Sequence, residues 1–314
     1  MAKVVVFCAT RRGYRFLERL SRMVTNADLV VLSFREEPTE PPFLDDIRKL
    51  AESRGATFIE ARSMNSPRMR AFWEDQSVDL ILAVSWRYMI PSDVYRKARL
   101  GAFVFHDSLL PGYRGFAPTV WAIVNGEDHT GVTLFAMVDE VDAGDIVDQE
   151  RVTIRPSDTI ADVLERVTKT YLIVLDRQIH ALLDGRTSRR PQDHQHATYT
   201  CKRTRDDDEI DWRASTSSIY NLIRATTAPY PGAWTTLDDK TMLVWEAREL
   251  VEPRRYIGRR PGRVLEVRPG EGTVVATGDG SILLTRVQFQ DEATVCAAAI
   301  LRNLSQTLGH RTQG

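Results

Sequence analysis

The stretch Asp79–His106 reads DLILAVSWRYMIPSDVYRKARLGAFVFH. It contains two apolar runs, 79–86 and 102–106, separated by a short helical pattern at 92–98. Both runs are apolar at successive positions, as strands are when both faces of a parallel sheet are covered. A helix between two such strands is the usual crossover that makes them parallel. The stretch therefore predicts a β-α-β unit whose second strand ends at His106.

The same alternation fills the sequence before this unit. Short β-rich runs at 3–7, 28–34 and 58–60 alternate with helical patterns. We therefore predict an α/β domain with a Rossmann-like, mostly parallel sheet and helices on both of its faces.

Two strands in a hairpin-like arrangement, 131–138 and 145–154, are predicted next, followed by a long amphipathic helix that Gly185 ends. Apolar residues recur along this helix at the three- and four-residue spacing of one buried face. They are Ile160, Val163, Leu164, Val167, Tyr171, Leu172 and Leu175.

The composition is that of an ordinary soluble protein. The chain has 314 residues, 43% hydrophobic and 27% charged, with a net charge of -1, so nothing favours binding to a polyanion over its whole surface. No apolar run approaches the roughly 18 to 20 residues that span a bilayer, which predicts no membrane segment. Three widely spaced cysteines without CxxC spacing argue against disulfides and zinc, and we expect a reduced, cytoplasmic protein.

A second domain is predicted after a polar, Pro-punctuated segment. Short strands separated by turn signals follow it, and we expect an OB-like β-barrel closed by a terminal helix over 293–309. The predicted division is a catalytic domain at 1–188, a linker at 189–202 and a C-terminal domain at 203–314.

The turn after the first strand, CATRRGYRF, has one glycine and neither phosphate-binding glycine motif. Its backbone cannot approach a pyrophosphate in the usual way, which disfavours NAD and ATP.

His106 ends a predicted central strand, where an imidazole can act as a general base near neutral pH. A hydrogen-bonded core histidine is the alternative. A carboxylate in the later turn DEVDAGD could orient the imidazole, but acidic residues crowd this segment and a solvated acidic loop is equally compatible. Spacing does not choose among Asp139, Glu140, Asp142, Asp145 and Asp148.

The run HDSLLPGYRGFAPTVWAIVNGEDHTGVTLFAMVDEVDAGDIV (106–147) resembles the signature region of the folate-dependent formyltransferases. The SLLPxYRG turn, the PxxWAIxNGE helix, the TGVTL strand and the DAGDI turn match in order and spacing. KRTRDDDEIDW, APYPGAW and SQTLG resemble the small C-terminal domain shared by the tRNA and sugar enzymes of that family. The overall pattern is most similar to the formyltransferase acting on UDP-4-amino-4-deoxyarabinose.

This resemblance implies 10-formyltetrahydrofolate as formyl donor and no metal. It implies that His106 is the general base and that Asp142 orients it. The loops implied to hold the donor supply Trp86, Arg87, Tyr88, Met89, Ile90, Asp139, Glu140 and Val141. Residues implied near the acceptor are Ser108, Leu110, Tyr113 and Arg114.

Val104 departs from the family pattern, because the family places an asparagine two residues before the histidine. Loss of one oxyanion donor typically costs roughly 10²- to 10³-fold in rate. The formyltetrahydrofolate hydrolase-type domain resembles this chain in carrying an aliphatic residue there, so hydrolysis with release of formate is the alternative activity.

The acceptor expected from the resemblance is the amine of a small molecule, most simply a nucleotide-linked amino sugar. A methionyl-tRNA formyltransferase is the third possibility, but it would carry a basic insertion where this chain has the acidic SFREEPTEPPFLDD, and this disfavours a nucleic-acid partner. A homodimer is compatible with the sequence.

Overall fold

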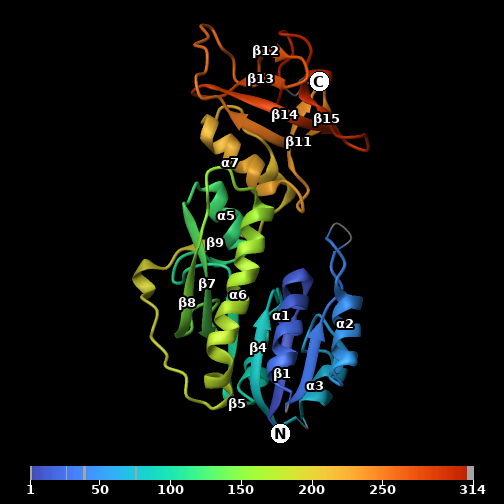
Figure 1. Ribbon diagram of the computed structural model, residues 1–314, viewed down its shortest axis with the longest axis vertical. Helices are drawn as coiled ribbons and strands as arrows, with labels where there is room; N and C mark the ends of the chain where they lie inside the picture. The colour runs from blue at the N-terminus through green and yellow to red at the C-terminus, as the bar shows by residue number, and fades with distance from the viewer. Residues whose placement is uncertain (1, 26, 38–39, 75, 310–314) are drawn as a thin grey trace. The chain divides into compact units, whose positions relative to one another are not determined.

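The structure is a computed structural model that describes residues 2–25, 27–37, 40–74 and 76–309 (Figure 1). The chain forms two compact units. The first contains the chain up to Pro118, His129–Thr153 and Leu164–Cys201; the second contains Thr119–Asp128, Ile154–Val163 and the chain from Lys202. The domain boundaries given above stay a prediction. Among the helices in the described ranges, none combines the length and the apolar run that a membrane span requires.

The first unit is built on a seven-stranded sheet in the order β3-β2-β1-β4-β5-β7-β8. Neighbours from β3 to β5 are parallel, whereas β7 is antiparallel to both β5 and β8. This confirms the predicted mostly parallel sheet and the hairpin. The strands are β1 (Lys3–Cys8), β2 (Asp28–Ser33), β3 (Thr57–Glu60), β4 (Val78–Val84), β5 (Ala98–His106), β7 (His129–Ala136) and β8 (Ile146–Thr153).

Helices cover both faces of this sheet (Figure 1). Phe105 of β5 stacks on Tyr171 of α6 and packs edge-on against Phe16 of α1, so these two helices share one face. On the other face, Trp73 of α3 and Val94 of α4 pack with apolar residues of β1 and β4. The helices are α1 (Thr10–Met23), α2 (Leu44–Ser53), α3 (Pro67–Glu74), α4 (Ser92–Tyr95) and α6 (Ile160–Leu183).

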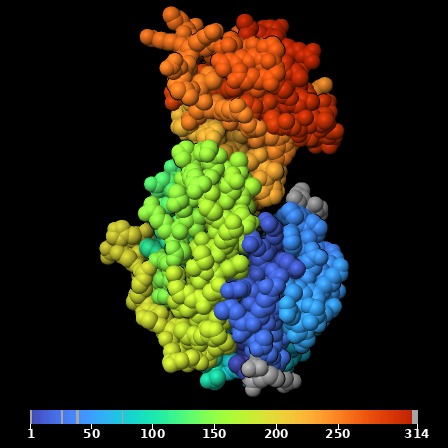
Figure 2. All heavy atoms as spheres, viewed as in Figure 1, coloured from blue at the N-terminus to red at the C-terminus, as the bar shows by residue number. Residues whose placement is uncertain are grey.

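Part of α6 lies beside α1, and Figure 2 shows the two segments next to each other on one face of the first unit. Ion pairs join them, from Arg15 to Glu165 and from Arg19 to Asp176. The long helix predicted from the sequence is thus confirmed, and it ends before Gly185, whose φ is +66°. A positive φ suits glycine because it has no Cβ.

The second unit carries a six-stranded antiparallel sheet in the order β10-β11-β14-β13-β12, with β15 paired to β14. A separate C-terminal antiparallel domain is therefore confirmed, while its description as OB-like stays a prediction. Its core includes Trp212, Ile223 and Val275. Its elements are α5 (Pro118–Val124), α7 (Thr216–Thr226), β10 (Ala233–Leu237), β11 (Lys240–Glu249), β12 (Val264–Arg268), β13 (Gly272–Ala276), β14 (Ser281–Phe289) and β15 (Val295–Cys296).

The predicted terminal helix is wrong. Val295 and Cys296 instead form β15, and between it and Gly309, the last residue that the structure describes, a single 3-10 turn, Ala297–Ala299, follows. Pairing with β14 occupies the backbone of β15, and Leu301 is buried in the core. Because tertiary pairing decides such short apolar segments, local helix propensity was misleading here.

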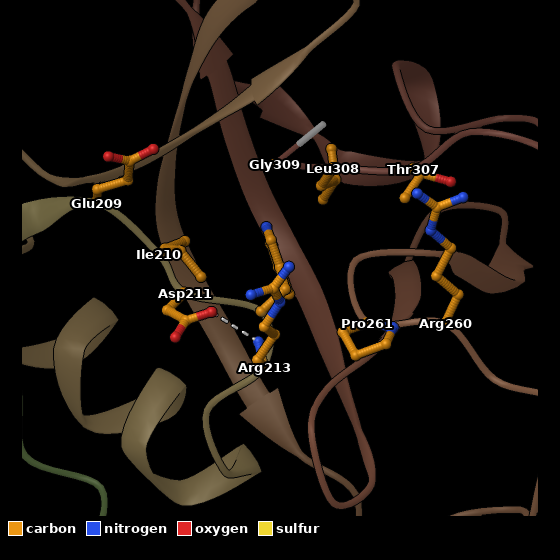
Figure 3. Close-up of a pocket in the computed structure, with 10 residues that line it drawn as sticks. Glu209, Ile210, Asp211, Arg213, Arg260, Pro261, Thr307, Leu308 and Gly309 are labelled. Atoms are coloured by element: carbon orange, nitrogen blue, oxygen red, sulfur yellow. Dashed lines mark hydrogen bonds between the residues drawn. The ribbon is translucent and has the colours of Figure 1, made fainter. Parts of the chain in front are cut away.

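One cavity of the second unit has a volume of about 600 Å³ (Figure 3). Its wall brings together the carboxylates of Glu209 and Asp211 and the guanidinium groups of Arg213 and Arg260. The wall therefore carries charged groups of both signs, and none of the predicted site residues lines it.

Candidate active site

His106 is the last residue of β5, at the carboxyl end of the parallel strands. Ligands of open α/β sheets bind at this end. The chain turns away immediately after His106, because the Thr133 hydroxyl of β7 donates to the Ser108 carbonyl at 2.6 Å and accepts from the Leu110 N–H at 3.1 Å. His106 is only 9% exposed, so its position in the sheet places a nearly buried imidazole at the ligand-binding edge.

The imidazole of His106 has a defined tautomer when neutral. Its Nε2 lies 2.8 Å from the carbonyl oxygen of Tyr113, and a carbonyl only accepts, so Nε2 carries the hydrogen. Its Nδ1 lies 3.6 Å from Oδ2 of Asp142. A proton taken up at Nδ1 therefore faces a carboxylate, which is an arrangement suited to general acid-base chemistry.

Asp142 is held in a strained turn. Its φ is +51°, in the left-handed region that costs roughly 1–2 kcal/mol for a residue with a Cβ. The Gly115 N–H donates to Oδ2 of Asp142 at 2.8 Å and fixes the carboxylate. Gly115 has a φ of +103°, and a Cβ there would lie 2.7 Å from the Thr200 carbonyl oxygen, so only glycine fits.

The segment that supplies Thr200 is fastened to the site by backbone pairing. The short strands β6 (Arg114–Gly115) and β9 (Tyr199–Thr200) pair in parallel. The residues between Gly185 and β9 therefore follow the surface of the first unit, to which they are assigned.

Geometry separates Asp142 from the other acidic residues of its segment. Three of the other carboxylates that spacing could not rank form ion pairs and Asp145 is exposed, whereas Asp142 faces His106. Asp139 pairs with Arg96, Glu140 with Arg114 and Asp148 with Arg177.

Asp107, the residue after His106, belongs to a mostly buried cluster that the sequence analysis did not predict. Arg12 Nη1 lies 2.6 Å from both carboxylate oxygens, and the Tyr171 hydroxyl contacts Oδ1. The same hydroxyl lies 3.0 Å from the Phe105 carbonyl oxygen. Tyr171 of α6 therefore contacts both residues that flank His106, Phe105 and Asp107. No local pattern signals this cluster, because Arg12 and Asp107 are 95 residues apart.

The ionisation of this cluster is set by its surroundings. Burial raises the pKa of Asp107, but the charge of Arg12 and the hydrogen bonds from Tyr171 and Arg12 outweigh it, and the net pKa lies below the usual value. Burial raises the pKa of Tyr171 well above its usual value, and the Asp107 charge adds to this. Asp107 is therefore a carboxylate and Tyr171 a neutral donor at physiological pH.

Comparison with known families decides the class of the protein. The formyl transferase family model matches residues 21–179, and the model of the formyl transferase C-terminal domain matches residues 202–305. The chain belongs to the formyl transferase family. The resemblance drawn from the sequence motifs is thus confirmed, and the family is one of transferase enzymes.

Among curated relatives, the bifunctional polymyxin resistance protein ArnA of Wigglesworthia glossinidia brevipalpis is 29% identical over 263 residues. The match covers 84% of this chain and 40% of that protein, so the chain spans less than half the length of this relative.

Solved structures share the fold. An N-formyltransferase from Helicobacter canadensis, in complex with folinic acid and dTDP-3-aminofucose, matches with a TM-score of 0.69 at 17% identity, over 92% of this chain and 100% of that one. HypX from Aquifex aeolicus, in complex with tetrahydrofolic acid, matches with a TM-score of 0.60 at 21% identity, over 95% of this chain and 46% of that one.

In this member of the formyl transferase family, the loop that follows β4 is the one expected to hold the formyl donor. Trp86 and Tyr88 pack edge-on against Phe34, and Arg87 pairs with Glu40. Two further predicted contacts differ in accessibility. Ile90 is buried in the core, whereas Met89 is 67% exposed.

The opposite loop presents a second exposed apolar residue, Val141, which is 46% exposed, one position before Asp142. The two acidic residues predicted beside it are held by neighbours. Asp139 accepts from the Tyr95 hydroxyl at 2.6 Å, and Glu140 lies 3.4 Å from Arg114. Exposed apolar groups of this kind are suited to contact an aromatic ligand.

The residues predicted near the acceptor are mostly buried. Ser108 donates to the Gly112 carbonyl at 2.7 Å, and Leu110 packs with Phe135 and Ile146. Tyr113 is half-buried, with a φ of +58°, and offers His106 its carbonyl.

Arg114 is fully buried. Its guanidinium group donates to Gln192 Oε1 at 2.7 Å and to the Tyr199 hydroxyl at 3.0 Å, and it lies 3.1 Å from Nδ1 of His194. These partners lie in the segment before β9 and in β9 itself.

Val104 lies on the same face of β5 as His106 and pairs in register with Phe135. It packs against the cluster of Leu110, Phe135 and Ile146. The Ser108 hydroxyl already donates to a carbonyl and Asp107 is ionised, so these two neighbours do not supply the donor that valine lacks.

Proposed function

We propose that the protein is a 10-formyltetrahydrofolate-dependent N-formyltransferase that transfers the formyl group to the amine of a small acceptor, a nucleotide-linked amino sugar. The observation that carries this proposal is the pair formed by His106 Nδ1 and Asp142 Oδ2, 3.6 Å apart at the carboxyl end of β5. The match to ArnA and the fold shared with enzymes that act on amino sugars support the choice of acceptor.

In this proposal the acceptor amine attacks the formyl carbon, and Nδ1 of His106 takes up the proton that the amine loses. The attack forms the new C–N bond and gives a tetrahedral intermediate whose oxygen carries the negative charge. This intermediate collapses when the bond between the formyl carbon and N10 of the donor breaks and His106 returns the proton to N10. Asp142 stabilises the imidazolium between these two transfers, because its carboxylate already faces Nδ1.

The residues after β4 fit a folate-type donor. Met89 and Val141 expose apolar surface from the two loops beside the catalytic pair. The indole N–H of Trp86 is buried and has no hydrogen-bond partner within the described part of the chain. An unsatisfied buried donor is costly, and an acceptor atom of a bound pterin would satisfy it.

The proposal assigns the chemistry to the first domain and part of the acceptor site to the C-terminal domain. A cytoplasmic location and a homodimer belong to the same proposal. The segment SFREEPTEPPFLDD is acidic, which argues for a small acceptor over a tRNA.

One observation favours a second activity. Val104 has apolar packing where the family places a donor for the oxyanion, and the hydrolase-type domain that resembles this chain also carries an aliphatic residue there. In that reaction water replaces the amine and formate is released. The alternative function is therefore a 10-formyltetrahydrofolate hydrolase.

Incubation with 10-formyltetrahydrofolate, with and without a panel of amino-sugar nucleotides, separates the two activities when tetrahydrofolate and formate are followed independently. Tetrahydrofolate that depends on the acceptor and appears without formate supports transfer. Formate that appears without an acceptor supports hydrolysis. His106→Ala should abolish either reaction, and turnover at the wild-type rate would remove His106 from the mechanism.

A further inference from the structure

The side chain of Gln192 lies at the centre of the contacts that surround the catalytic pair. It is 5% exposed, and it comes from the segment between α6 and β9 rather than from the strands or the two catalytic loops. Its Nε2 donates to the Asp142 carbonyl at 2.8 Å and to the Gly144 carbonyl at 2.7 Å. One amide group thus ties both sides of the turn that carries Asp142.

The oxygen of the same amide faces the other half of the site. Oε1 of Gln192 accepts from Nη2 of Arg114 at 2.7 Å and from Nε at 3.2 Å. Both hydrogens and the oxygen of the amide are therefore used, as expected for a buried polar group.

The backbone around Arg114 contacts both catalytic residues. The Tyr113 carbonyl accepts from His106, and the Gly115 N–H donates to Asp142. A rigid link between Arg114 and the turn of Asp142 therefore fixes the two partners relative to each other. The link is needed because Asp142 has a positive φ, a conformation that persists only when its surroundings impose it.

Gln192 is itself fixed in register. The backbone of Arg190 exchanges two hydrogen bonds with Ile146, at 2.8 and 2.9 Å, two residues before Gln192. The side chain therefore enters the site from a segment that is already anchored to the start of β8.

We propose that Gln192 is a positioning residue of the transfer reaction, which links Arg114 to the Asp142 turn and holds Asp142 at its working distance from His106. This inference rests on the proposed function for its kinetic consequence. Its structural content, the dependence of the Asp142 carboxylate on Gln192, stands apart from any activity.

The informative substitution is Gln192→Glu. It keeps the oxygen that accepts from Arg114 but removes both N–H donors to the Asp142 turn, so it cuts the link on one side only. Gln195→Glu is the matched control, because it makes the same change in an exposed residue of the same segment.

The first measurement is hydrogen exchange of the Gly115 amide, which reports its bond to Asp142. Exchange in Gln192→Glu should be at least about tenfold faster than in the wild type, because the turn opens locally. Gln195→Glu should leave it unchanged. Unchanged protection in Gln192→Glu would overturn the proposal, whatever the activity of the protein.

The second measurement is a double-mutant cycle for transfer. Gln192→Glu should lower kcat roughly 10²-fold, as small misplacements of catalytic groups do, while KM for the donor changes little. In an Asp142→Ala background it should have almost no further effect, because it acts through Asp142. Full additivity of the two losses would contradict positioning. If the wild type has no transferase activity but the Gly115 amide still exchanges faster in Gln192→Glu, the proposed function is rejected. The role of Gln192 in positioning Asp142 is then retained.

Discussion

Nε2 of His106 donates to the carbonyl oxygen of Tyr113, seven residues further along the chain, at 2.8 Å. The turn that follows the strand thus folds back onto the histidine and selects its tautomer. Nδ1 is left facing Asp142, which a distant segment of the chain holds in place. The orientation of the imidazole is a local property of the sequence, whereas the position of the carboxylate that faces it depends on tertiary structure.

Asp142→Asn should lower transfer roughly 10²-fold, because the amide keeps an oxygen for the Gly115 N–H but loses the charge that stabilises the imidazolium. Steady-state rates with donor and acceptor at saturation measure this. Asp145→Asn, a change at an exposed carboxylate of the same loop, should be neutral. Equal rates for Asp142→Asn and the wild type would show that the carboxylate has no electrostatic role.

Val104→Asn should raise transfer, by up to roughly 10²-fold, if it restores an oxyanion donor beside His106. Stability should fall, because the amide enters the apolar cluster around Phe135. Rates and thermal unfolding of Val104→Asn and Val104→Ala separate the donor from the effect of smaller size. A gain in both variants, or in neither, would mean that this position does not act through a hydrogen bond.

Gly115→Ala should impair both stability and transfer, because the φ of +103° and the Thr200 carbonyl at 2.7 Å exclude a Cβ. The strain corresponds to about 1–3 kcal/mol in the free energy of unfolding. Gly112→Ala is the control, since its Cβ would meet nothing closer than 3.4 Å. Urea unfolding and rates for both variants test this, and equal behaviour of the two would contradict the described approach of β6 to β9.

Asp107→Asn should destabilise the protein at pH 7 by roughly 3–5 kcal/mol, because Arg12 loses its buried partner. The pKa of Asp107 is lowered in the folded protein, so its stabilising contribution is complete above its usual value of 3.8. The contribution is lost as the pH falls from there through the lower folded value.

The difference in unfolding free energy between the wild type and Asp107→Asn should therefore shrink below about pH 4. Urea unfolding between pH 3 and 7 measures it. Asp176→Asn, in an exposed pair with Arg19, should cost less than about 1 kcal/mol at pH 7. If the difference in unfolding free energy between the two proteins grew as the pH falls, the assignment of Asp107 as a buried carboxylate would be refuted.

The sequence predicted the parallel sheet because its strands are apolar at successive positions, and it predicted that His106 ends β5 because the apolar run stops there. The family motifs pointed to Asp142, which residue spacing alone could not separate from its acidic neighbours. The contacts of Gln192 and the cluster of Arg12, Asp107 and Tyr171 were not predictable, since their partners are distant in sequence and have no periodic pattern. The prediction of a terminal helix was wrong for a related reason, because pairing of β15 with β14 outweighed the local helix propensity.

The two-residue pairing of β6 with β9 has a practical consequence for dissecting the protein. The chain between α6 and the second unit pairs with the Arg114–Gly115 dipeptide, whose Gly115 N–H donates to Asp142 and which directly follows the Tyr113 carbonyl that accepts from His106. A fragment cut at residue 188 would discard this pairing together with Gln192. Any catalytic fragment therefore has to extend at least to Cys201, and cleavage of the chain between 189 and 198 should lower the activity of the protein.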